Sequence, residues 1–139
     1  MFDGRLLVVG EYRLPLKFIK LETYKATPNQ RLDRDSYEDA NGDLQRNALD
    51  KTRTKIEFET PPLHYFDKRE FMANLREQFN KSQAEYNQRK VQLTYFNDET
   101  DEYDTAFFYI PDITWTYYNV DEQHADILYM PTRIAFIEY

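Results

Sequence analysis

Apolar and polar residues alternate along several short stretches of the chain, a pattern typical of β-strands with one buried face. In residues 12–24, for example, Leu14, Leu16 and Phe18 are predicted to share one face of a strand. Alternation or short apolar runs predict the other strands at 6–9, 54–60, 91–96, 105–110, 112–118 and 127–139, the last bent at Pro131. The pattern therefore predicts a mainly β (α+β) fold of about seven strands, arranged as a β-sandwich or barrel.

One segment has a helical period instead. Phe71, Leu75 and Phe79 recur at a spacing of four, which places them on one helical face. Asp67 is a good N-cap residue, and a glutamate follows it three positions later, as in a capping box. The sequence therefore predicts one α-helix over residues 67–80, flanking the sheet with its apolar stripe.

The stretch from residue 25 to residue 50 is rich in charged residues and poor in large apolar ones. Asn41-Gly42 lies in its centre, and Asn-Gly is the strongest two-residue signal for a β-hairpin turn. Such a segment cannot bury a face of its own. We therefore expect a long arm or hairpin with its tip at Asn41-Gly42, which projects, is disordered or lies on a partner.

Composition supports one β-rich domain spanning residues 1–139. The chain has 139 residues, 17 % of them aromatic and only 3 glycines, and aromatic side chains favour pleated surfaces. The net charge of −7 argues against a protein built to coat nucleic acid, which needs clustered Lys and Arg. No apolar run approaches the ~20 residues of a membrane helix, and the run 6–9 is too short for a secretory signal.

The search for reactive groups favours a protein that is not an enzyme and that has no cofactor or metal site. There is no cysteine, and Ser36 and Ser82 lack the surroundings of an activated nucleophile. His64 and His124 have no second histidine at a metal-binding spacing. The acidic residues around Asn41-Gly42 do not fit the register of a calcium loop. A set of aromatic residues is interpreted as core and interface packing: Tyr95, Phe107, Phe108, Tyr109, Trp115, Tyr117, Tyr118 and Tyr129.

Three stretches carry a resemblance to a known group of proteins. They are residues 34–46 (RDSYEDANGDLQR), 52–58 (TRTKIEF) and 133–139 (RIAFIEY). Together they resemble small uncharacterised phage and prophage proteins of Gram-positive hosts, usually encoded among tail and virion-assembly genes. The order of strands, arm and helix is also similar to the tail-tube fold, which is reused in distal-tail and baseplate-hub rings.

The resemblance implies a virion structural protein, a tail, tail-adaptor or baseplate subunit. It would be made in the host cytoplasm and would form a homo-oligomeric ring through which DNA passes. Its partners would be further copies and other tail proteins, with no sequence-specific nucleic acid and no membrane. Glu57 and Glu59, which alternate with Ile56 and Phe58, are the candidate lumen-facing acids. The candidate inter-subunit residues of the arm are Arg31, Arg34, Tyr37, Asn41, Gly42, Leu44 and Arg46.

Two other functions remain open at this stage. One is a small acidic binding or inhibitor module that mimics the charge of DNA, which the net charge of −7 suggests. The other is a carbohydrate-binding β domain, in which Trp115 and nearby tyrosines would stack on sugar rings.

Overall fold

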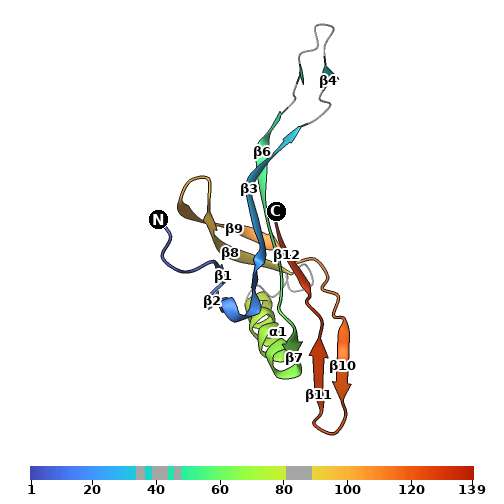
Figure 1. Cartoon of the computed structure of the whole chain (residues 1–139). Coiled ribbons are helices and arrows are strands. Elements are labelled where there is room, and N and C mark those ends of the chain that lie inside the picture. Colours follow the sequence, from blue (N-terminus) through green and yellow to red (C-terminus); the bar gives the residue numbers. More distant parts are fainter. Residues whose placement is uncertain (34–36, 39–43, 46–47, 81–88) are drawn as a thin grey trace.

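A computed structural model of the chain describes residues 1–33, 37–38, 44–45, 48–80 and 89–139, with side chains for 1–30, 53–79 and 89–139. Within these residues the fold is mainly β, with twelve strands, one α-helix and one short 3-10 helix (Figure 1). The predicted fold class is confirmed at this level. Strands outnumber the prediction because several are only two or three residues long, too short to produce a hydrophobic period.

Seven antiparallel strands form the main sheet, in the order β2-β1-β8-β9-β12-β6-β3. The sheet is not closed into a barrel, and β2 and β3 are its edges. Its strands are β1 (Leu7–Val9), β2 (Tyr12–Arg13), β3 (Lys20–Asp33), β6 (Ala48–Glu59), β8 (Lys90–Asn97), β9 (Glu102–Tyr109) and β12 (Arg133–Glu138).

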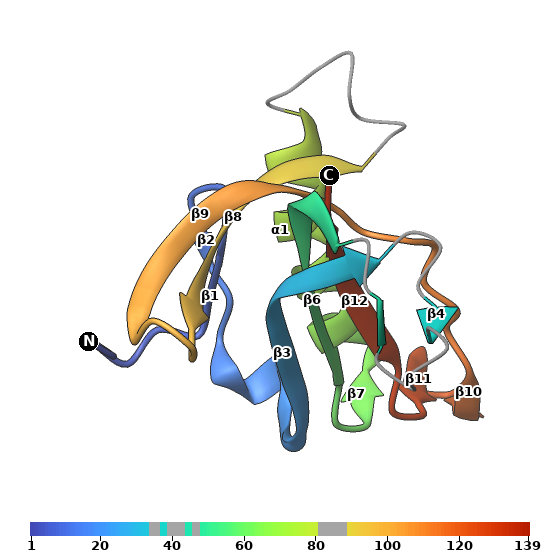
Figure 2. The same cartoon turned by 90° about the horizontal axis from the view of Figure 1, so that it is seen from above.

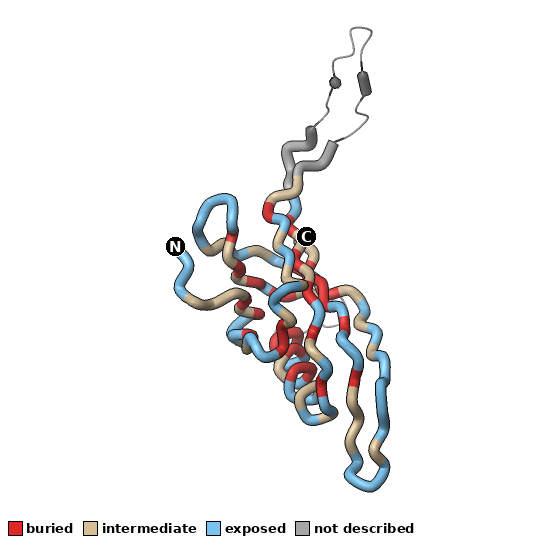
Figure 3. Tube along the Cα trace, viewed as in Figure 1, coloured by how far each residue is buried: buried red, intermediate tan, exposed pale blue. Residues whose placement is uncertain are grey.

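The helix α1 (Tyr65–Asn80) lies against the inner side of the curved sheet (Figure 2). Phe71, Leu75 and Phe79 are buried there among side chains of β1, β6, β8, β9 and β12, as predicted. Buried residues concentrate in this region, between the sheet and the helix (Figure 3). Each large apolar side chain buried in this way contributes about 1.5–3 kcal/mol to folding.

The helix begins at Tyr65, two residues before the predicted N-cap. Asp67 therefore lies in the first turn, where a negative charge favours the helix dipole. A distant side chain accepts the first free N–H instead. The Tyr65 amide donates to Asp126 Oδ1 at 3.3 Å, a contact that the local sequence pattern does not contain.

Several of the predicted strands are wrong in extent. Residues 12–24 are not one strand, because a 3-10 helix (Leu16–Phe18) follows Pro15 and breaks the alternation, leaving Leu16 exposed. Residues 112–116 are not in a strand either. Ile113 and Trp115 pack against the core from this segment, which runs between β9 and the next strand.

A second sheet has three antiparallel strands in the order β10-β11-β7. They are β7 (Leu63–His64), β10 (Tyr117–Asp121) and β11 (Asp126–Tyr129). The predicted final strand is thus divided into β11 and β12, with Pro131 between them. Two further short strands, β4 (Tyr37–Glu38) and β5 (Leu44–Gln45), pair with each other.

Candidate interaction surfaces

The predicted arm appears as an extension of two strands of the main sheet. β3 and β6 continue past the other strands of the sheet (Figure 1). β12 pairs with β6 only from Lys55 to Glu59, whereas β3 pairs with β6 as far as Asp33 opposite Ala48. In the described part of the chain, the outer half of β6 therefore has β3 as its partner strand.

The predicted arm residues lie partly within the described strands. Arg31 belongs to β3, Tyr37 to β4 and Leu44 to β5, which pairs with β4 in antiparallel fashion. The others lie outside the described residues: Arg34, Asn41, Gly42 and Arg46. The predicted turn at Asn41-Gly42 is thus in the untested part of the arm.

Buried hydrogen bonds hold the base of the extension. Thr54 is completely buried, and its Oγ1 accepts the Asn29 N–H at 3.0 Å. The same Oγ1 shares a hydrogen bond with the Tyr95 hydroxyl at 3.1 Å, and the Thr54 N–H donates to Glu138 Oε2 at 3.2 Å. Asn29 has a φ of 51°, in the left-handed region that favours asparagine among non-glycine residues. These contacts fix where the extension leaves the sheet.

Glu57 and Glu59 project from the face of β6 opposite the core, as their alternation predicts. Ile56 and Phe58 are buried on the inner face. The Glu57 carboxylate accepts two hydrogen bonds from Arg133, at 2.6 and 3.1 Å, and lies 3.9 Å from Lys55. The hydrogen bonds from Arg133 lower the pKa of Glu57. The negative charge of Glu57 is therefore largely compensated.

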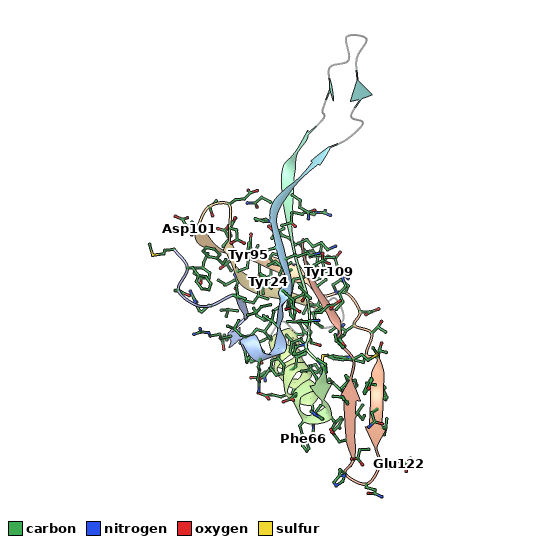
Figure 4. The ribbon with its side chains drawn as sticks, in the orientation of Figure 1. Tyr24, Phe66, Tyr95, Asp101, Tyr109 and Glu122 are labelled. Atoms are coloured by element: carbon green, nitrogen blue, oxygen red, sulfur yellow. The ribbon has the colours of Figure 1, made fainter. Side chains whose placement is uncertain are left out.

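The end of the molecule opposite the extension exposes several large apolar side chains. Phe66 on α1 is 73 % exposed and Tyr118 on β10 is 71 % exposed. Tyr117 and Val120 of the same strand are also exposed. Phe66 and Glu122 mark this end in Figure 4. The strand β10 thus presents an uncovered, largely aromatic surface, and Phe66 is a further exposed ring at this end of the molecule.

The aromatic side chains beside this surface form a continuous stack that leads to the core. Tyr117 packs edge-on against the buried Tyr129, with ring centroids 5.2 Å apart, and Tyr129 packs against Trp115 at 5.5 Å. Trp115 in turn contacts Phe71 at 6.5 Å. The Lys68 ammonium lies 5.4 Å from the centre of the Tyr129 ring, a cation–π distance. Trp115 is thus a packing residue that joins the small sheet to the helix.

A histidine–carboxylate pair connects the small sheet with the start of α1. His64 Nδ1 lies 2.7 Å from Asp126 Oδ2, while Asp126 Oδ1 accepts the Tyr65 N–H. The hydrogen bond from His64 lowers the pKa of Asp126. In the hairpin turn, the other predicted lone histidine, His124, pairs with Asp121 at 2.8 Å. Both histidines thus have structural contacts with a single carboxylate.

A family model matches the chain over residues 1–139, and its description reads "Family of unknown function (DUF6711)". The chain belongs to this family. Neither the curated proteins nor the solved structures contain a match to it. Family membership therefore leaves the function of the chain to be argued from its surfaces.

The described residues of this DUF6711 chain hold no group of three or more His, Asp or Glu side chains placed to bind a metal ion. No described helix is long and apolar enough to cross a membrane. The aromatic set divides among three environments, with Tyr109 and Trp115 half-buried. Tyr95, Phe108 and Tyr129 are buried, as the packing interpretation predicts, whereas Phe107, Tyr117 and Tyr118 are exposed. Alternation along a strand does not identify which of its faces remains uncovered. The exposure of Tyr117 and Tyr118 could therefore not be predicted from the sequence pattern.

Proposed function

We propose that this chain is a non-enzymatic structural subunit that assembles with further copies of itself in the tail module of a bacteriophage virion. The observation that carries the proposal is the extension of β3 and β6 beyond the sheet. The sequence resemblance to phage and prophage tail-module proteins supports the choice of setting. In this proposal the chain is one tail-tube-like β domain, and the extension is the arm that reaches a neighbour.

The physical support comes from the cost of holding such an extension out into solvent. A two-stranded ribbon is marginally stable in water because it has no third strand or helix to cover its face. In this chain, however, the base of the ribbon is fixed by the completely buried Thr54 and its bonds to Asn29 and Tyr95. A directed ribbon of this kind is suited to contact a neighbouring molecule.

A ring with a central passage for DNA is the finer form of the proposal. An extension that contacts a neighbouring copy makes a contact between unlike surfaces, which closes into a ring when the rotation between copies allows it. An acidic lumen would repel DNA phosphates and let the genome pass. Because Arg133 compensates Glu57, the acidic character of such a lumen would depend on Glu59 and on other acids more than on Glu57.

The test is the mass and shape of the purified protein. Sedimentation velocity and light scattering over a wide concentration range are expected to give a defined multiple of the 16.9 kDa chain. Negative-stain images of the same sample are expected to contain ring-shaped particles. A monomer at every concentration, both alone and mixed with co-encoded tail proteins, would overturn the proposal.

A further inference from the structure

The edge strand β10 is exposed along its whole length. Its residues Tyr117, Tyr118, Asn119 and Val120 are all exposed, and Asp121 at its end is half-buried. Its exposed apolar side chains form a surface that we call the aromatic edge: Tyr117, Tyr118 and Val120. An edge strand with uncovered apolar side chains offers unpaired backbone groups to another chain.

The other described sheet edges are blunted, as is usual in soluble β proteins. β2 and β7 have only two residues each. β3 has a wide irregularity between Lys20 and Lys25, where the Thr23 hydroxyl accepts the Glu59 N–H at 2.8 Å. β10, in contrast, has no lysine, arginine or proline. The aromatic edge is therefore the least protected of these edges.

The charge of the β10–β11 hairpin itself is one-sided, and Lys68 of α1 lies 5.4 Å from the Tyr129 ring beside it. The β10–β11 hairpin, residues 117–129, carries the acids Asp121, Glu122 and Asp126 and no lysine or arginine. Exposed aromatic rings with carboxylates at their margin suit a segment that presents lysine and arginine side chains. Such cations bind carboxylates directly and also stack on ring faces.

The same chain carries such a segment at its opposite end. The part of β3 and β6 that leads from the sheet into the extension, which we call the basic stem, consists of residues 25–32 of β3 and 51–56 of β6. The strands pair there from Ala26 opposite Ile56 to Arg31 opposite Thr52. The sequence of the basic stem has five positive residues and no acidic one, Lys25, Arg31, Lys51, Arg53 and Lys55, while Glu57 at its base lies 3.9 Å from Lys55. The stem leads away from the sheet on the side opposite the β10–β11 hairpin (Figure 1).

We propose that the basic stem of one copy docks against the aromatic edge and acidic hairpin of a second copy. This inference rests on the proposed self-assembly and names the two surfaces that meet. Because the surfaces differ and lie at opposite ends, the contact is head-to-tail and can repeat from copy to copy. Complementary charge selects this orientation over a contact between two acidic hairpins.

The test uses two charge-reversed variants of the full chain. The stem variant is Lys25→Glu/Arg53→Glu, at two exposed positions. The hairpin variant is Glu122→Lys/Gln123→Lys, in the exposed turn after β10. The matched control is Glu99→Lys/Thr100→Lys, which makes the same charge change in the exposed turn between β8 and β9. Circular dichroism verifies that each variant is folded before association is measured by sedimentation velocity.

For each test variant alone, the dissociation constant of self-association is expected to rise on the order of tenfold or more. In each variant, charges of the same sign then face one another across the stem–hairpin contact. An equimolar mixture of the two is expected to associate again, because each surface then meets its complement. The control is expected to associate like the natural chain. A natural chain that assembles while neither variant weakens it overturns this inference and leaves the proposed function standing. A natural chain that stays monomeric overturns both.

Continued self-association of the stem variant alone, with loss only in the hairpin variant, would indicate a symmetric contact between two hairpins. That outcome would also overturn the head-to-tail contact.

Discussion

Replacing Thr54 by valine tests whether the base of the extension is held as the structure indicates. Valine keeps the shape of threonine and removes only the hydroxyl. The change removes the partner of the buried Tyr95 hydroxyl and of the part-buried Asn29 N–H. Each buried group left unpaired costs about 1–3 kcal/mol. We therefore expect Thr54→Val to lower the free energy of unfolding by about 2–4 kcal/mol.

Thermal and urea unfolding followed by circular dichroism measure this loss. For a chain of this size, 1 kcal/mol corresponds to about 4 °C, so the melting temperature should fall by roughly 8–16 °C. Tyr95→Phe removes one of the two partners and should cost about 1 kcal/mol. In the double variant the two losses should not add, with a coupling of about 0.5–3 kcal/mol, because both remove the same hydrogen bond.

The matched control is Thr94→Val on the outer face of β8. Its hydroxyl shares a hydrogen bond of 2.9 Å with Thr105, but there the pair is exposed to water. Its removal should change the free energy of unfolding by less than about 0.5 kcal/mol. Equal effects of Thr54→Val and Thr94→Val would refute the reasoning. Hydrogen exchange at the Asn29 amide supplies a local readout, since Thr54→Val should accelerate it more than global unfolding does.

Three further changes test other parts of the structure. Gly10→Ala should lower stability by about 1–3 kcal/mol in urea unfolding, because φ is 62° there and a methyl group would collide with the Gln78 side chain; an unchanged midpoint would contradict this conformation. Leu75→Ala should cost about 2–5 kcal/mol, since the side chain is completely buried, and a cost below about 1 kcal/mol would place it outside the core. The lowered pKa of Glu57 means that its pair with Arg133 stabilises the fold at neutral pH and is lost as the pH falls through that pKa. Unfolding measured between pH 7 and pH 3 should therefore depend less on pH in Glu57→Gln than in the natural chain, and equal pH dependence would contradict the pair.

The sequence predicts most of the helices and strands that arise from a local pattern of apolar and polar residues. The helical face of Phe71, Leu75 and Phe79 is correct because an amphipathic period is a local property of the chain. The start of the helix is wrong because its first N–H is accepted by Asp126, which is 61 residues away. Capping by distant residues leaves no trace in the spacing of nearby ones.

The candidate surfaces were predictable only in part, for a similar reason. The polar composition of residues 25–50 predicts an arm, and β3 and β6 do extend there. The aromatic edge was missed because Tyr117, Tyr118 and Tyr129 have the same residue type and occur on the same hairpin. Tyr129 is buried in contact with Trp115, which comes from an irregular segment, and with Tyr117. Burial of this kind depends on tertiary packing, which a strand period does not encode.

The distribution of charge argues for the same contact that the uncovered edge suggests. With a net charge of −7, the five positive charges of the basic stem leave −12 on the rest of the chain. Two copies therefore repel over long distances through their bodies, while the stem and the hairpin attract at contact. At about 0.1 M salt, the interaction between charges separated by over ~10 Å is largely screened, whereas pairs in contact are screened much less. As salt is added, the long-range repulsion between the two bodies therefore weakens before the attraction between stem and hairpin does. The stem is then the part of one copy that the acidic hairpin of another can approach closely.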